Sequence, residues 1–458
     1  MIDVERTRRS RRTTRLRLWL VQRARFVRRL RLVTGLRFAR TRSGSVRTLD
    51  MRTRTHTALR GCLALWIGGI AAGLLGCQAN RAPDRPVLFF PAPPDAPRIQ
   101  FLTWASGADE LEPKKGALAE YVLGQEPALK RAIQKPYGIA VHDGVAYVCD
   151  TKGLSICRMD FRNHSFTTFG VSGPGRVRKP LNIAIDARGY KFVVDAERKQ
   201  IVVFGPNDQY VTAYDVPPPS HPVDIAIYED ELYVLDNDDT CQIIVMDRTT
   251  GKVVRSIGGP GGEPGKFKIP NSLAISPDGF LYVSDTHNWR IQKLTRDGKS
   301  VWEKGSPGYT IGQFGRPRGI RVGPDGTVYV VDGATEIVQM FDPDGQTLMR
   351  FGGPGDTPGS LGLPSTLAID TSALPAFKEF VHKDFDAKYL LFVASQFGDH
   401  LVSVYALGSF PPGYQLSESQ VERLPTAPMK EGIGPVRGDE APVEPLPREE
   451  RESGEQGK

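Results

Sequence analysis

The sequence predicts an all-β fold, a six-bladed β-propeller closed into a ring by a strand from its N-terminal side. Three observations lead to this prediction: a unit that recurs six times, short β-rich runs inside each unit, and turn sequences between the runs. A period of roughly 40–50 residues with several strands per repeat is typical of a propeller blade and not of a helical solenoid.

The repeated unit has the form Pro-x-x-Ile/Leu-Ala-Ile/Val. Its prolines are separated by 44, 42, 48, 47 and 47 residues and are Pro136, Pro180, Pro222, Pro270, Pro317 and Pro364. Each unit continues through a turn into an aromatic–Val pair such as Tyr282–Val283, where β-branched and aromatic residues mark a strand. Pro-Asp-Gly at 277–279, 324–326 and 343–345 supplies the dihedral angles that tight turns need.

An Asp stands two residues after that Val in five units, and a Ser in the sixth: Asp150, Asp195, Asp236, Asp285, Asp332 and Ser395. Because each Asp is expected where a strand enters a turn, we interpret the series as structural acceptors of backbone N–H groups. The acid-rich run 236–239 is likewise interpreted as a solvated turn, since it lacks the further ligands of a calcium loop.

The segment Ser256–Leu294, which contains Ile-Pro-Asn-Ser-Leu-Ala-Ile-Ser-Pro-Asp-Gly-Phe-Leu-Tyr-Val-Ser-Asp, closely resembles an NHL repeat. The next unit, Gly312–Phe341, matches nearly as well, and the resemblance extends over residues 98–407. It implies a six-bladed NHL propeller. It implies little about activity, because NHL propellers include enzymes, RNA binders and ligand-binding scaffolds.

The sixth unit is interrupted by a long insertion and lacks an outer strand, whereas Arg98–Trp104 reads as a strand that precedes the first unit. We predict that this strand completes the sixth blade and closes the ring. Residues 105–135 then cross to the first blade, with a helix expected around 117–132. The insertion contains Phe377, Phe380 and Phe385, which we expect to pack on the propeller rather than to form a docking patch for a partner.

The N-terminal segment predicts export. Sixteen uncharged residues, 61–76, follow a positive flank, are too few to span a membrane, and suit the apolar core of a signal peptide. They end in Leu-Leu-Gly-Cys77, which resembles the bacterial lipobox; the resemblance implies lipidation of Cys77, and Gln78 in place of Asp favours an outer-membrane destination. The alternative is an uncleaved anchor helix. Residues 1–50 are interpreted as a mis-assigned start or a basic arm, 51–76 as the signal peptide, 77–97 as a Pro-rich tether and 408–458 as a disordered Pro/Glu-rich tail.

Charge excludes nucleic acid as a partner. Residues 1–60 hold 19 of the 60 basic residues and 3 of the 52 acidic ones, so residues 61–458 have 41 basic against 49 acidic residues, a net charge of −8. Binding to a phosphate backbone needs a concentrated positive surface. Cys149 and Cys157 flank a predicted turn, and a cross-strand disulfide or two separate half-buried thiols are both compatible with that spacing.

The candidate ligand site is a rim. Residues just after each repeat proline and in the turns after each second strand share one face of the propeller, and a mixed polar and aromatic ring at its mouth suits a ligand, although a plain solvated rim fits equally. The candidate residues are Tyr137, Asn182, Asp224, Asn271, Ser272, Arg318, Arg321, Thr366, His287 and Trp289. Arg321 stands where the other five units have Ala, so we expect an ion pair with Asp224 rather than a ligand contact.

Two functions remain open. Amidating lyases of this fold hold zinc on His residues, and gluconolactonase-like propellers hold a divalent ion on acids and Asn. Six His residues follow the signal peptide, and none of them occupies either of the two positions after a repeat proline. Asp224, Asn182 and Asn271 remain as weak candidate ligands for a divalent ion. The sequence therefore predicts no cofactor or metal, and a lipid-anchored, non-catalytic binding or scaffold module of the cell envelope for a protein, peptide or glycan. The alternative is a metal-dependent propeller enzyme of the lactonase or amidating-lyase type.

Overall fold

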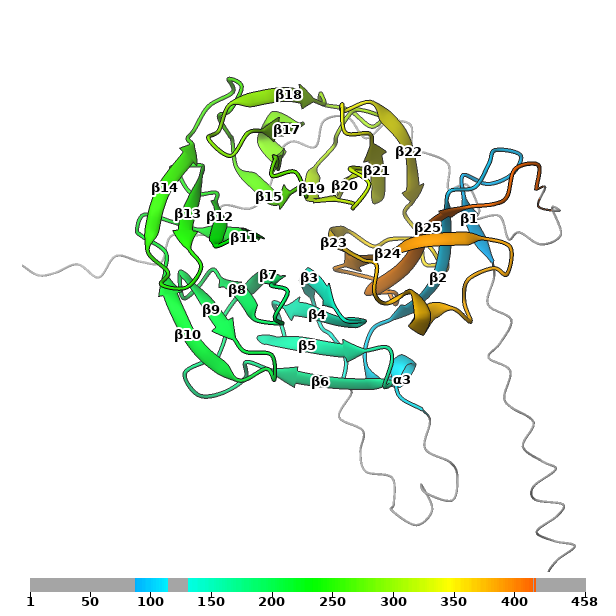
Figure 1. Ribbon diagram of the computed structural model, residues 1–458, viewed down its shortest axis with the longest axis horizontal. Coiled ribbons are helices and arrows are strands. Elements are labelled where there is room, and N and C mark those ends of the chain that lie inside the picture. Colours follow the sequence, from blue (N-terminus) through cyan, green and yellow to red (C-terminus); the bar gives the residue numbers. More distant parts are fainter. Residues whose placement is uncertain (1–86, 114–130, 415, 417–458) are drawn as a thin grey trace, which may run out of the picture. The chain divides into compact units, whose positions relative to one another are not determined.

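The computed structural model describes residues 87–113, 131–414 and 416. Within them, six antiparallel sheets surround a common axis, which confirms the all-β six-bladed propeller (Figure 1). The Arg-rich segment, the signal peptide and Cys77 lie outside the described residues, as do nearly all of the expected helix around 117–132 and most of the predicted tail. In the described part of the chain, no helix is long and apolar enough to cross a membrane.

Blades one to five each contain four strands in chain order, with the first strand at the axis (Figure 1). Blade one is β3 (Pro136–His142), β4 (Val145–Asp150), β5 (Ser155–Asp160) and β6 (Ser165–Phe169); blade two is β7 (Pro180–Ile185), β8 (Lys191–Asp195), β9 (Gln200–Phe204) and β10 (Tyr210–Asp215). Blade three is β11 (Pro222–Tyr228), β12 (Glu231–Asp236), β13 (Gln242–Asp247) and β14 (Val253–Gly258). Blade four is β15 (Pro270–Ile275), β16 (Leu281–Asp285), β17 (Arg290–Leu294) and β18 (Ser300–Lys304); blade five is β19 (Pro317–Val322), β20 (Val328–Asp332), β21 (Ile337–Phe341) and β22 (Thr347–Gly352).

Every inner strand begins at the repeat proline, as the repeat predicts. The aromatic–Val pair of each second strand is buried, and its two side chains point to opposite faces of the sheet because strand side chains alternate. In blade three, Tyr233 packs with Leu273 of blade four, while Val234 packs with Ile201 of blade two. The core therefore consists of apolar layers between neighbouring blades, and each blade depends on both neighbours.

Blade six confirms the predicted closure. It contains β23 (Pro364–Asp370), β24 (Asp386–Ser395) and β25 (Val402–Ser409), and β2 (Ile99–Ala105) pairs with β25 in the register Phe101↔Tyr405. The predicted tether is in part a strand: β1 (Leu88–Phe90) pairs with β2 and gives this sheet a fifth strand. A one-turn helix, α3 (Ala108–Leu111), follows β2.

The insertion packs on the propeller, as expected. Phe377, in the short helix η2 (Leu374–Phe377), and Phe385 are buried, and Phe377 contacts Phe161 of blade one. Phe385 also contacts Phe89 and Phe410, so the start of the predicted tail joins the same aromatic cluster. The insertion therefore ties blade one to both ends of blade six.

The disulfide between Cys149 and Cys157 is not formed, which corrects one of the two sequence interpretations. Cys149 lies opposite Ile156 and Cys157 lies opposite Val148, so the two side chains point to opposite faces of the blade. Both thiols are free and fully buried rather than half-buried. Burial, with a smaller contribution from Asp150, raises the pKa of Cys157 to about 12, so this thiol stays protonated and unreactive at neutral pH.

The repeated Asp residues have the structural role that the sequence predicts. Asp332, at the end of β20, accepts hydrogen bonds from the backbone N–H groups of Gly315 (2.8 Å) and Arg316 (2.9 Å), just before the repeat proline, and from that of Ala334 (3.0 Å) in the following turn. Asp150 and Asp195 make the same kind of bonds in their blades. Each carboxylate thus fixes the connection that enters an inner strand.

We expect Asp332→Ala to lower the free energy of unfolding by about 2–4 kcal/mol, because three partly buried backbone N–H groups lose their acceptor at roughly 1 kcal/mol each. The measurement is urea denaturation followed by tryptophan fluorescence. Asp344→Ala, in an exposed turn of the same blade, is the control and is expected to change stability by less than about 0.5 kcal/mol. Equal unfolding midpoints for the two variants would contradict the structural role.

Candidate functional site

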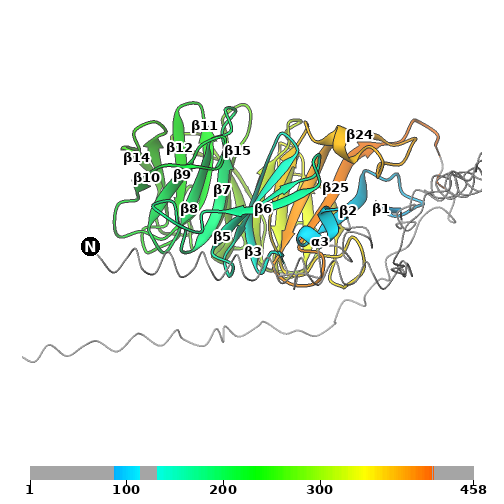
Figure 2. The same cartoon turned by 90° about the horizontal axis from the view of Figure 1, so that it is seen from below.

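The inner strands run side by side from one face of the propeller to the other (Figure 2). We call the face where they begin the Pro-side face, and the face where they end the strand-end face. The rim predicted from the sequence lies at the Pro-side face. Two of its members are in the turn between β16 and β17 rather than on an inner strand: His287, in the short helix η1 (Thr286–Asn288), and Trp289, which is exposed.

Tyr137 closes the channel at the Pro-side face. Its hydroxyl, on blade one, accepts a hydrogen bond of 3.2 Å from Asn271 Nδ2 on blade four, the blade opposite in the ring. The guanidinium of Arg318, on blade five, lies 5.2 Å from the Tyr137 ring centroid. Ser365 of blade six donates a hydrogen bond of 2.6 Å to the Tyr137 backbone oxygen. The concave mouth expected at this face is therefore filled by side chains.

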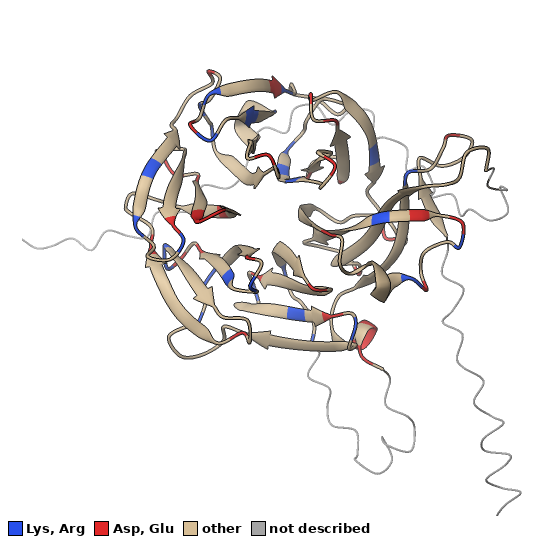
Figure 3. Cartoon of the chain, viewed as in Figure 1, with Lys and Arg blue, Asp and Glu red and all other residues tan. Residues whose placement is uncertain are grey.

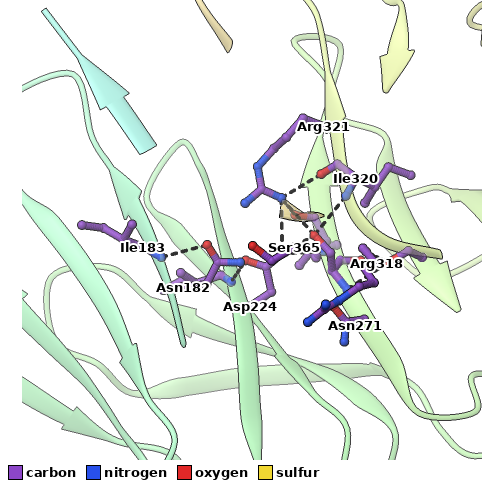
Figure 4. Close-up of polar contacts among 12 residues, drawn as sticks. Asn182, Ile183, Asp224, Asn271, Arg318, Ile320, Arg321 and Ser365 are labelled. Carbon is purple, nitrogen blue, oxygen red and sulfur yellow. Dashed lines mark hydrogen bonds and ion pairs between the residues drawn. The ribbon is translucent and has the colours of Figure 1, made fainter. Parts of the chain in front are cut away.

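We call Tyr137, Asn271 and Arg318 the plug. Beneath the plug, Asp224 and Arg321 form the ion pair that the sequence predicts, with 3.3 Å between Arg321 Nη1 and Asp224 Oδ2 (Figure 4). Asp224 is 0% exposed. Its Oδ2 also accepts from Ser272 Oγ (2.6 Å) and Leu273 N (2.9 Å), and its Oδ1 accepts from Ile225 N (2.8 Å). The carboxylate thus joins blades three, four and five, and both of its oxygens accept hydrogen bonds.

Ser272 strengthens the same junction. Its hydroxyl accepts hydrogen bonds from Arg321 Nη1 (3.0 Å) and from the backbone N–H of Ile320 (3.2 Å) while it donates to Asp224. Arg321 Nη1 further reaches the carbonyl oxygens of Ile320 (2.7 Å) and Leu273 (3.3 Å). Within the described residues, no hydrogen bond is made by the other two nitrogens of this guanidinium, Nη2 and Nε, and neither is among the buried unpaired atoms.

The remaining rim residues are buried near the axis. Asn182 is 2% exposed, and its Oδ1 accepts from the backbone N–H of Ile183 (3.0 Å), as Asp224 does with the next residue. Thr366 is buried, and its hydroxyl has no hydrogen-bond partner in the described structure. Gly138 holds the matching place in blade one, where an added Cβ would lie 2.5 Å from the Asn182 Cα atom. Close approach of neighbouring inner strands therefore requires glycine at that position.

Asn182, Asp224, Ser272 and Thr366 form a polar layer across the channel, and a pocket of about 240 Å³ lies beyond it. Its walls are the last residues of the six inner strands, and Arg321 is the only charged residue among them. The others are aliphatic, with Ala in five blades where blade five has Arg321. The outermost wall residue of each inner strand, such as Ile185 or Ile227, is partly exposed, whereas Asn182, Asp224, Ser272 and Thr366 are buried. The pocket is therefore accessible from the strand-end face, opposite the predicted mouth.

The charge of the axis is positive. From the repeat proline to the fifth residue, the six inner strands contain Arg318, Arg321 and a single acid, Asp224. Arg318 is only 5% exposed, makes no ion pair within the described chain, and its Nε is buried without a hydrogen bond. A buried cation stacked on a tyrosine and a second cation that shares one carboxylate together favour an anion at the axis.

The residues of the channel do not fit a divalent metal ion. In the part of the chain that the structure describes, no three His, Cys, Asp or Glu side chains converge as a ligand set. Both carboxylate oxygens of Asp224 already accept hydrogen bonds, Asn182 is bonded to its own strand, and Asn271 is bonded to Tyr137. Burial, and then Lys179, lower the pKa of His221, the residue before Pro222, but no second His joins it.

The sequence does not predict the plug, the pocket at the strand-end face, or a basic hollow beside blade two. The hollow is lined by Arg176, Arg178 and Arg198, none of which is among the candidate residues of the rim. A local count of charge around Pro180 would have found it, because residues 176–199 contain seven Lys or Arg against three acids, whereas residues 61–458 as a whole are net acidic.

A family model described as the SMP-30/gluconolactonase/LRE-like region matches residues 263–365, from the end of blade three to the start of blade six. Similar solved structures include a gluconolactonase from Xanthomonas campestris, 18% identical over 71% of this chain and 99% of that chain, with a TM-score of 0.45. A catalytically inactive virginiamycin B lyase from Staphylococcus aureus with quinupristin is 17% identical over 60% of this chain and 96% of that chain, with a TM-score of 0.43. A calcium-binding regucalcin from Agrobacterium tumefaciens is 16% identical over 62% and 95%, with a TM-score of 0.43.

At these identities the likeness to solved structures is one of fold. The family-model match concerns propellers grouped with gluconolactonases, so it favours the enzyme alternative of the sequence analysis over the non-catalytic interpretation. The NHL resemblance and the lipoprotein form stay predictions. The chain is thus a six-bladed β-propeller with a stretch of about a hundred residues similar to the SMP-30/gluconolactonase/LRE family.

Proposed function

We propose that this protein is a lipid-anchored envelope propeller that binds a small organic anion in its axial pocket. The observation behind this proposal is Arg321, a single cation in an otherwise aliphatic pocket, at a position where the other five blades have Ala. An apolar pocket with one convergent charged group is the usual form of a small-molecule site. The aliphatic walls would hold the apolar body of the ligand.

The geometry of Arg321 suits a carboxylate. Its Nη1 is held by Asp224, Ser272 and two carbonyl oxygens, which fixes the guanidinium in place, while Nη2 and Nε have no dashed contact in Figure 4. Two donors on one edge of a guanidinium match the two oxygens of a carboxylate. Low polarity around the pocket strengthens such a bond relative to one in water.

The setting of the site is also part of the proposal. Lipidation of Cys77 would hold the propeller at a membrane surface through residues 77–87, with the outer membrane favoured by Gln78. The propeller would then face the periplasm or the cell exterior. A protein or glycan of the envelope is the partner expected there, in addition to the axial ligand.

Fluorine NMR of para-fluorobenzoate, with the full-length protein purified in detergent, tests the axial site. We expect the protein to broaden the para-fluorobenzoate signal beyond a detergent blank, and to have much less effect on para-fluorobenzyl alcohol, which has the same ring without the charge. Arg321→Gln should weaken para-fluorobenzoate binding at least tenfold. Arg350→Gln, on the exposed outer strand β22, removes one charge elsewhere and should leave binding unchanged. Equal binding of acid and alcohol, or full binding by Arg321→Gln, would contradict the proposal.

The family-model match supports a second candidate, a propeller enzyme acting on a lactone or a related ester. Because the axial donors do not fit a divalent ion, we expect purified protein to contain no stoichiometric metal by mass spectrometry, and any lactone hydrolysis to survive a chelator. Stoichiometric metal that is lost in Asp224→Ala, together with chelator-sensitive hydrolysis, would establish the metal-dependent enzyme and contradict a metal-free anion site at the axis.

A further inference from the structure

A hollow of about 490 Å³ lies at the Pro-side end of blade two, away from the axial pocket. It is formed by the connection between β6 and β7 and by the turn between β8 and β9. Its lining residues are Gly173, Pro174, Arg176, Arg178, Glu197, Arg198 and Gln200. None of them lines the axial pocket, and neither the rim prediction nor the proposed function uses the hollow.

Arg198 is built into the wall of the hollow. Its Nη1 donates to the carbonyl oxygens of Pro174 (3.1 Å) and Arg176 (2.9 Å), and its Nε donates to Gln200 Oε1 (2.8 Å). Its Nη2 makes no hydrogen bond within the described chain. The guanidinium therefore has a fixed orientation and keeps a free donor.

Asp195 holds both sides of the hollow together. It accepts from the backbone N–H groups of Arg178 (2.7 Å) and Lys179 (3.0 Å) on one side, and of Arg198 (3.2 Å) on the other. Val177, between the two exposed arginines, is fully buried, and its N–H donates to the Gly170 oxygen (2.8 Å). The arginines therefore extend from a backbone that is already ordered, and a ligand would not have to order it.

The local charge is strongly positive. Arg176, Arg178 and Arg198 line the hollow, Lys179 and Lys199 are exposed next to them, and Glu197 is the only acid of the lining. The contact from Glu197 to Arg178 is long, at 3.9 Å, and both side chains are exposed, so it neutralises little. Lys and Arg segments are spread around the whole ring in Figure 3, and here five of these residues lie in or next to one hollow.

We propose that this hollow binds a phosphorylated sugar, such as one carried by an envelope glycan. Three guanidinium groups around one concavity match the several oxygens of a phosphate, because each guanidinium donates in a fork. The volume leaves room for the sugar ring beside the phosphate. Gln200, whose amide already bonds Arg198 and Asp215, and the backbone of Gly173 line the part of the hollow left for the sugar ring.

Isothermal titration calorimetry of the full-length protein with α-glucosyl phosphate, inorganic phosphate, glucuronate and glucose tests this assignment. We expect α-glucosyl phosphate to bind at least tenfold more tightly than each of the other three, and its affinity to fall as salt is added. Arg176→Gln/Arg178→Gln, both exposed positions, should weaken it at least tenfold. The matched control, Lys299→Gln/Arg350→Gln, removes the same charge from exposed positions of blades four and five and should bind as the wild type does.

The outcomes are distinct. No measurable binding of α-glucosyl phosphate, or equal binding by the Arg176/Arg178 variant, would overturn the site. Equal affinity for inorganic phosphate would show a simple anion site without a sugar, and equal affinity for glucuronate would show a carboxylate site; either contradicts the assignment. Arg321→Gln should leave this titration unchanged while it weakens para-fluorobenzoate binding at least tenfold, so the two proposals fail independently.

Discussion

Phe101→Ala is expected to lower the free energy of unfolding by about 3–5 kcal/mol, the usual cost of emptying a buried phenylalanine site. Phe101 is 2% exposed, lies opposite Tyr405 in β25, and contacts it edge to face at 5.4 Å between ring centroids. The same side chain packs in the cluster that joins blade six to blade five. Because β2 is the strand that closes the ring, loss of the Phe101 side chain weakens the seam between the first and last parts of the propeller.

The measurement is the urea midpoint of the variant, with Phe397→Ala as its control. Phe397 is 57% exposed in the turn between β24 and β25, so the same truncation there should change stability by less than about 0.5 kcal/mol. We also expect limited proteolysis of Phe101→Ala to begin near β1 and β2, since local opening would start at the weakened closure. Equal midpoints for the two variants would show that β2 does not stabilise the ring.

The fold could be predicted because its signals are local and repeated. Six prolines at similar spacing start six inner strands, and the missing outer strand of the last unit required a donor from elsewhere, which Arg98–Trp104 supplied. β1 could not be predicted, since three apolar residues flanked by prolines do not differ from a linker until β2 offers them an edge. The choice between a disulfide and two separate thiols stayed open for a similar reason: the strand register decides on which face each Cys lies, and sequence spacing does not give the register.

The site could be predicted only where one blade departs from the others. Arg321 was visible because five units have Ala at its position, and its pairing with Asp224 followed from the need to compensate a buried charge. The plug was not visible, because the bond between Tyr137 and Asn271 joins residues 134 positions apart across the axis. The accessible end of the channel was placed on the wrong face for the same reason: side chains, not the backbone topology, decide which end is filled.

Asp224→Ala should be the most disruptive substitution at the axis, with an expected loss of about 3–5 kcal/mol in the free energy of unfolding. It removes the acceptor of Ser272 Oγ and of the Leu273 and Ile225 N–H groups, and it leaves the cation of Arg321 without a counter-charge. Asp224→Asn should cost less, because Asn182 at the matching position of blade two already accepts the equivalent backbone bond.

A double-mutant cycle separates the pair from its surroundings. The double variant Asp224→Asn/Arg321→Ala should lose less free energy of unfolding than the two single variants lose together, by about 0.5–3 kcal/mol, because each single variant leaves one group unpaired. Additive losses would show that the two side chains do not interact. Replacement of a buried ion pair by apolar groups is often neutral or stabilising, and the other five inner strands pack at the axis with Ala at the matching position. Stability alone therefore gives no reason for Arg321 in blade five, whereas an anionic ligand in the axial pocket does.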